Sequence, residues 1–230
     1  MPNTHTRRES LNALDACRAA NLWKECNEQC FRTIYELPRA MQMGFAKFAL
    51  QSYVQDLQSR KPEITWPSRL LVDPADWIAT YGRTIPGEPM DSHPADAVFL
   101  NAVDGLFFGV ACPDSQPGLV TTGFVYSAVN AIEAKAIDAW ATADPEAAHL
   151  WQSISSGIEG AALEEALQRF AGRSYQEMPS TAVFRDREWH SLIDWLRQES
   201  IDTYPPVENI EEMERALQEW KDREMLLPSG

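Results

Sequence analysis

The hydrophobic residues of this 230-residue chain recur at helical spacing along most of its length, and the most apolar stretch lies near the middle. Between residues 98 and 110 the apolar side chains fall all round a wheel of 3.6 residues per turn. This run predicts a helix that is buried on nearly every side, and we expect it to be the central helix of the fold. A second apolar run, residues 125–140, follows after a short segment rich in proline and glycine. We therefore expect an antiparallel helical hairpin over residues 93–141.

Amphipathic patterns predict further helices on both sides of the hairpin. Many prolines interrupt the stretch before the hairpin, so regular structure should be brief there, with one short helix that begins after Asp73. These patterns predict an all-α (mainly α) protein, a compact multi-helix bundle in a single domain. Its expected parts are N-terminal helices at about residues 9–60, a long Pro-rich connector at 61–92, the hairpin at 93–141, further helices at 144–171 and a C-terminal helical pair at 186–225, within one domain spanning 1–230.

The charge of the chain limits the classes of molecule that it is expected to bind. Lys and Arg number 20 against 34 Asp and Glu, which gives a formal net charge of −14. Such a field repels nucleic acid and anionic lipid surfaces, so we expect neither as a partner. The N-terminal residues carry no signal-peptide pattern and no stretch has the length and apolarity of a membrane span, which predicts a cytoplasmic protein. A basic protein is the partner that the charge favours, although many proteins are acidic merely because charge keeps them in solution.

No motif predicts catalysis, a cofactor or a metal site. The best metal candidates are Cys26 with Cys30, and Glu146 with His149, and each pair supplies only half a site. We interpret the two cysteines as small buried hydrophobes. We therefore predict no catalytic residue, no cofactor and no metal ligand.

Two polar residues interrupt the first run of the hairpin. Asn101 and Asp104 stand three residues apart in an otherwise apolar helix. If they are buried, they must find partners, because an unpaired carboxylate in an apolar interior costs several kcal/mol. They could be the floor of a pocket, a buried hydrogen-bonded contact or a narrow exposed stripe. We take them as a candidate buried polar site.

The last predicted helix is strongly acidic. A solvated face explains this run without any ligand, yet its acids are also the first candidates for contacting a basic partner. The candidate partner-binding residues are Glu211, Glu212, Glu214 and Glu219.

Size, charge and architecture give the chain a resemblance to a class of known proteins. The segment from His93-Pro-Ala-Asp-Ala-Val-Phe-Leu through Ala136-Ile-Asp-Ala-Trp140, together with the acidic final helix, resembles the helical immunity proteins that bacteria make to neutralise their own secreted toxins. The resemblance implies a tight complex with a cognate toxin, in which acidic side chains steer association and buried aromatic residues anchor it.

Two other functions stay open. One alternative is a helical-bundle enzyme with a metal or small-molecule site, built from Asp104, Glu133, Glu146 and His149. The other is a scaffold or regulator that self-associates, for instance as a homodimer. The sequence favours the protein-binding function because it lacks enzyme motifs.

Overall fold

The chain folds as a helical bundle, as predicted. The computed structural model describes residues 6–20, 23–85, 93–146 and 181–226, together with residues 149, 160–162, 164, 165, 168 and 169. No strand is present in these parts of the chain. The helices are α1 (Arg7–Ala19), α2 (Trp23–Ile34), α3 (Arg39–Arg60), α4 (Trp66–Val72), α5 (Pro74–Tyr81), α6 (Pro94–Ala111), α7 (Pro117–Ala143), α10 (Thr181–Gln198), the 3₁₀ turn η2 (Ile201–Thr203) and α11 (Ile210–Leu226).

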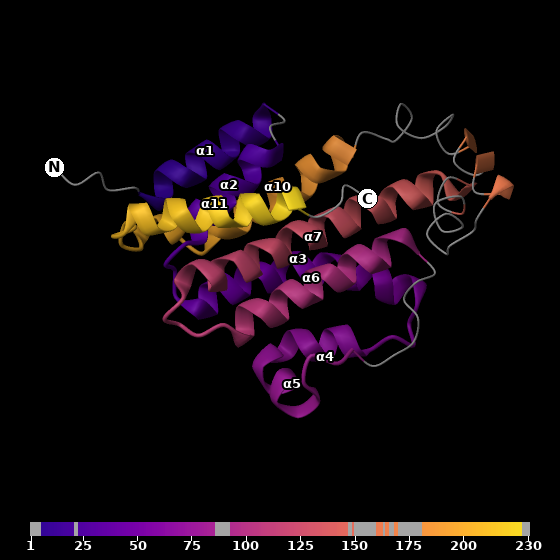
Figure 1. Cartoon of the computed structure of the whole chain (residues 1–230), viewed down its shortest axis with the longest axis horizontal. Helices are drawn as coiled ribbons and strands as arrows, with labels where there is room; N and C mark the ends of the chain where they lie inside the picture. The colour runs from indigo at the N-terminus through magenta and orange to yellow at the C-terminus, as the bar shows by residue number, and fades with distance from the viewer. Residues whose placement is uncertain are drawn as a thin grey trace.

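The helices form layers around α7. Helices α3, α6 and α7 lie side by side in the middle of the molecule, with α1, α2, α10 and α11 on one side and the short pair α4 and α5 on the other (Figure 1). One hydrophobic cluster contains buried residues of all these helices. The helix at its centre is α7, because it contacts α2, α3, α6, α10 and α11, whereas α6 contacts α3, α5 and α7. The prediction that the first helix of the hairpin would be central is therefore wrong.

Small side chains explain why α7 takes the central place. Its buried positions include Thr121, Gly123, Ser127 and Ala128, which hydrophobicity alone does not mark as core but which let neighbouring helices approach closely. The closest approach is within the predicted hairpin, where Gly123 of α7 faces Gly105 and Gly109 of α6. The hairpin itself is confirmed, and its two helices run over residues 94–111 and 117–143.

The connector contains more structure than predicted. Helix α5 begins as expected, with Asp73 accepting hydrogen bonds from the backbone amides of Ala75 and Asp76, both at 3.0 Å. A second short helix, α4, precedes it and was missed, although Pro67 in its first turn is the same kind of helix-start signal. Trp66 of α4 and Trp77 of α5 are both buried, so the connector adds to the core rather than looping past it.

The outer elements agree in part with the prediction. The N-terminal helices match the expected region, and α10 begins at Thr181, five residues before the predicted start at 186. The helices predicted at residues 144–171 lie mostly outside the described residues. Among the residues that the structure describes, no helix is long and apolar enough to cross a membrane.

Candidate functional site

A cluster of charged side chains lies where the C-terminal end of α3 meets the first turn of α6. At its centre is Asp96, which has no solvent exposure. Its Oδ1 accepts a hydrogen bond from the Tyr53 hydroxyl at 2.7 Å and lies 3.3 Å from Arg60 Nη2, while its Oδ2 lies 3.0 Å from Lys61 Nζ. The first turn of a helix also favours a negative charge, because the helix dipole is positive there. Asp96 is thus a buried carboxylate with a full set of partners, and we call these residues with Asp138 and His93 the Asp96 cluster.

The cluster extends to α7 through Asp138. Arg60 Nε lies 2.9 Å from Asp138 Oδ1, although the two atoms are not aligned for a hydrogen bond, so this contact is electrostatic. Burial raises the pKa of Asp138, and the negative charge of Asp56 raises it further, while Arg60 opposes both. Two carboxylates and two cations balance one another, so the cluster carries no net charge. It joins α3, α6 and α7 at one end of the bundle.

His93 caps α6 and takes part in the same cluster. Its Nδ1 accepts a hydrogen bond from the backbone N–H of Ala95 at 3.3 Å, and its Nε2 lies 3.5 Å from Asp138 Oδ1. Because Nδ1 accepts, the neutral ring carries its proton on Nε2, the nitrogen that lies near Asp138 without a hydrogen bond to it. Burial lowers the pKa of His93 to about 4, and the positive charge of Arg60 contributes to the shift.

This chemistry favours a structural role for the cluster over a catalytic one. The lone pair that a general base would need is used by His93 for the helix cap. Burial also raises the pKa of the Tyr53 hydroxyl far above its usual value, and the nearby Asp96 raises it further, so this hydroxyl stays protonated. The Asp96 cluster therefore holds three helices together through ion pairs and hydrogen bonds. The sequence analysis did not find this cluster, because the partners of Asp96 at the C-terminal end of α3 are 35 to 43 residues away along the chain.

The two polar residues predicted as a buried site are in fact exposed. Asn101 and Asp104 lie on the solvent side of α6, in line with exposed Ala97 and Ala111 at helical spacing. The prediction of burial is wrong because α6 packs on α7, α3 and α5 and leaves a narrow face open. The exposed stripe, which the sequence left open as an alternative, is the arrangement found.

The residues of the enzyme alternative lie mostly on the surface. Asp104, Glu146 and His149 are exposed and Glu133 is half-buried. Glu146 lies 3.1 Å from Arg169 in an ion pair between exposed side chains. Within the described part of the chain, no three His, Cys, Asp or Glu side chains form a group that could hold a metal ion.

The two cysteines of the candidate metal pair are core residues. Cys26 and Cys30 are both buried on α2, as predicted for small hydrophobic residues. Burial raises the pKa of the Cys30 thiol well above its usual value, which keeps the thiol protonated.

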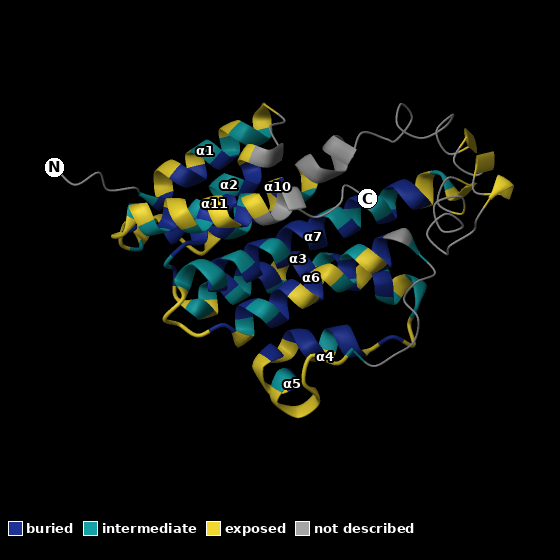
Figure 2. Ribbon diagram, viewed as in Figure 1, coloured by how far each residue is buried: buried dark blue, intermediate teal, exposed yellow. Residues whose placement is uncertain are grey.

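The acids of α11 have different surroundings. Glu211, Glu214 and Glu219 are exposed, and Glu212 is half-buried. Exposed positions follow the side of α11 that faces the viewer in Figure 2. Glu214 pairs with Arg32 of α2 through both carboxylate oxygens, one of them 2.9 Å from Arg32 Nη2.

The rest of the α11 surface explains which acids have a structural role. Glu212 accepts from the side chain of Asn209 at 3.0 Å and donates its backbone N–H to Asn209 Oδ1 at 3.0 Å, which caps the helix. Lys221 of α11 pairs with Glu28 of α2. Of the four predicted partner-binding residues, Glu212 therefore caps α11 and Glu214 ties it to α2. Glu211 and Glu219 are exposed, form no hydrogen bond or ion pair with the described residues, and remain the candidates.

Comparison with known proteins adds no relative: no protein-family model, curated protein sequence or solved structure matches this chain significantly.

Proposed function

We propose that this chain is an acidic protein-binding protein that acts inside the cell, and in particular an immunity protein that neutralises a secreted bacterial toxin by direct complex formation. The observation that supports the proposal is the exposed acidic face of α11 on a chain with a net charge of −14. A surface of one charge sign attracts a partner of the other sign and speeds its association. A basic toxin domain is the partner that this surface suits.

Glu211 and Glu219 are the two acids that we assign to the partner. They lie eight residues apart on α11 and are both exposed. Glu214 lies between them along the helix, but its contact with Arg32 gives it a role in holding α11 against α2. Substituting all four predicted acids together would mix the effect on binding with an effect on folding, so the test should change Glu211 and Glu219 alone.

The first experiment is rescue of growth. The chain is co-expressed with the toxic proteins encoded beside its gene, and the proposal predicts that one of them is no longer toxic and that it forms a stable complex with the chain. Rescue would also separate this function from the scaffold alternative, since a self-associating scaffold gives no protection. If none of these neighbours is neutralised, the immunity function is excluded.

The second experiment measures association kinetics with the rescued toxin. We expect the Glu211→Gln, Glu219→Gln double variant to associate about fivefold more slowly at low salt, because each variant removes a steering charge. The difference should shrink at about 0.15 M salt, where the Debye length is about 8 Å.

A matched control changes the same net charge elsewhere. Glu63 and Asp104 are exposed and lie away from α11, so the Glu63→Gln, Asp104→Asn variant should associate nearly as fast as the unmodified chain. Equal association rates for the two double variants would show that α11 does not face the partner.

A further inference from the structure

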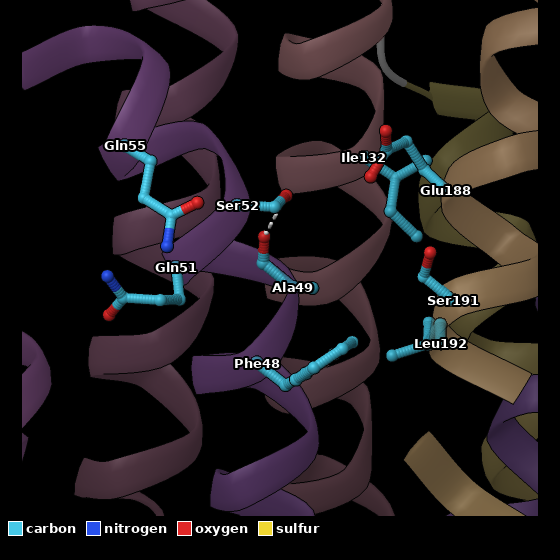
Figure 3. A pocket seen from close by; sticks show the side chains of 9 residues that line it. All are labelled: Phe48, Ala49, Gln51, Ser52, Gln55, Ile132, Glu188, Ser191 and Leu192. Atoms are coloured by element: carbon cyan, nitrogen blue, oxygen red, sulfur yellow. Dashed lines mark hydrogen bonds between the residues drawn. The ribbon is translucent and has the colours of Figure 1, made fainter. Parts of the chain in front are cut away.

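The exposed face of α3 carries no charge. Helix α3 is described along its whole length, and its exposed residues recur at intervals of three, four and eight, so they form one stripe along the helix. Gln51 and Gln55 extend from neighbouring turns of α3 on the same side of the helix (Figure 3). We call this surface the α3 stripe, and its residues are Ala40, Phe48, Gln51, Gln55 and Ser59.

An uncharged face of this length contrasts with the acidic surface of α11. The net charge of the chain is −14. The exposed residues of α11 include the four acids Glu211, Glu214, Glu219 and Asp222. Beside the α3 stripe, the half-buried Asp56 lies 3.0 Å from Lys135 of α7, so its charge is balanced within the chain. The α3 stripe is therefore a surface of low charge on a strongly acidic protein.

Apolar surface lies near the middle of the α3 stripe. Phe48 is 38% exposed, and its ring stacks on Trp195 of α10 with centroids 5.7 Å apart. Lys47 donates a hydrogen bond to the carbonyl oxygen of Val72 at 3.1 Å, which brings Val72, 79% exposed, close to the stripe. Beside Phe48 the surface is hollowed by a groove of about 240 Å³ between α3, α7 and α10 (Figure 3). Exposed aromatic residues with few charges are typical of the centre of a protein–protein interface.

We propose that the α3 stripe is a contact surface between two copies of this chain, related by a twofold axis that brings their α3 helices together. In a twofold contact, a side chain near the axis meets the same side chain of the other copy. A glutamine amide contains both a donor and an acceptor, so it can bond to its own copy, whereas two glutamates repel. The side-chain amides of Gln51 and Gln55 form no hydrogen bond with the described residues, so both are available for this pairing.

The charge of the chain favours a second copy over a basic protein at this surface. Two chains that each carry a net charge of −14 repel one another, and the repulsion is smallest where uncharged surfaces meet. A basic toxin is instead attracted to acidic surface such as that of α11, which packs on α2 and α7. A dimer through α3 uses none of the acids of α11, so the inference does not depend on the proposed function.

The dimensions of α3 predict a weak dimer. Its 22 residues make a helix about 33 Å long and about 10 Å wide, so one face covers about 330 Å². A standard protein–protein interface buries about 800 Å² of each partner. Even with Val72 and Trp195 at its borders, the contact is small, and the fraction of dimer should depend strongly on concentration.

Sedimentation equilibrium of the intact chain tests the proposal. We expect the average mass to rise from that of a monomer toward that of a dimer as the concentration is raised to about 0.5 mM, because an interface of this size associates weakly. Raising the salt from about 0.05 M to about 0.5 M should strengthen association, because salt screens the repulsion between two acidic copies. A contact made by acidic side chains with a basic surface would weaken instead.

Two double variants locate the contact. Gln51→Glu with Gln55→Glu keeps the shape of both side chains but puts four like charges into the dimer, so the dimer should be at least about tenfold weaker. Asn12→Asp with Asn101→Asp is the matched control, because it adds the same charge at exposed positions of α1 and α6. It should leave the dimer nearly unchanged. Circular dichroism checks that both variants fold.

A mixing experiment tests the twofold arrangement itself. Gln51→Glu and Gln51→Lys should each weaken the dimer, whereas an equal mixture of the two variants should associate more strongly than either alone, because opposite charges then meet. A mixture that associates no better than its components counts against the proposal, and this comparison also decides if the double glutamate variant does not fold.

Other outcomes would overturn the proposal. These are an unmodified chain that stays monomeric at about 0.5 mM in high salt, and equal losses of dimer in the two double variants. If the chain is monomeric and the double glutamate variant slows association with the toxin, the α3 stripe contacts that partner and the proposal is wrong. A monomeric chain with intact rescue removes only the dimer, and a dimeric chain without rescue removes only the immunity function.

Discussion

Two glycine-to-alanine substitutions should change stability in opposite directions. Gly123 and Gly44 both lie inside helices, where alanine is favoured over glycine by about 1 kcal/mol. A Cβ added at Gly44 would lie 3.4 Å from the ring of Trp195, which is an ordinary contact. A Cβ added at Gly123 would lie 2.6 Å from the Cα of Gly109 and 3.0 Å from the carbonyl oxygen of Gly105. These are backbone atoms, so no side-chain rotation can relieve the overlap.

These distances set the expected change in the free energy of unfolding. Overpacking in a well-packed core costs about 1–3 kcal/mol, and contact with backbone on the facing helix places Gly123→Ala at the upper end. After subtracting the gain in helix propensity, we expect Gly123→Ala to lower the free energy of unfolding by about 2 kcal/mol. For a chain of this size, that corresponds to a fall in melting temperature of about 4–8 °C. Gly44→Ala should instead raise the free energy of unfolding by up to about 1 kcal/mol.

Urea unfolding followed by circular dichroism measures both effects. The midpoints of the two variants should move to opposite sides of the unmodified chain, with similar slopes. If Gly123→Ala is as stable as the unmodified chain, then α6 and α7 do not pack by direct backbone contact at this point.

Two further predictions concern the Asp96 cluster. Because the pKa of His93 is about 4 in the folded chain and about 6.5 when unfolded, the unfolded state binds the proton first. The contribution of neutral His93 to the free energy of unfolding, about 3 kcal/mol, is therefore complete above pH 6.5 and is lost as the pH falls to 4. His93→Asn keeps a side chain that can cap the helix but does not titrate, so its urea midpoint should fall less over this range. Midpoints of the two chains that fall in parallel between pH 6.5 and 4 would contradict this prediction. Asp96→Ala removes a buried carboxylate from two cations and should cost about 3 kcal/mol in unfolding free energy, the low end of the usual range because Arg60 and Lys61 can turn to solvent. Asp114→Ala breaks an ion pair whose carboxylate is 82% exposed and should cost less than about 1 kcal/mol, so equal losses for the two aspartates would show that burial of Asp96 has no energetic effect.

Local patterns in the sequence predicted the helices well. Proline in the first turn marks the starts of α5 and α6, and the residues before these prolines, Asp73 and His93, do cap the helices. Apolar residues at intervals of three and four placed α3 and α10. Such signals work because they depend on neighbours within one or two helical turns.

Contacts between distant residues could not be predicted in the same way. Nothing near Asp96 in sequence indicates that it would be buried, since Tyr53 and Arg60 belong to another helix. Asn101 and Asp104 were predicted to be buried but are exposed. Because most residues of α6 are apolar, the sequence did not show which narrow face of the helix meets solvent.

The central position of α7 has a consequence for the newly made protein. The ribosome completes α7 before it adds α10 and α11, so the apolar surface that these two helices later cover stays open during that interval. Exposed apolar surface of this kind makes a folding chain prone to aggregation until its last helices arrive. A truncation that ends after α7 should therefore keep the hairpin but need a chaperone or low temperature to stay in solution.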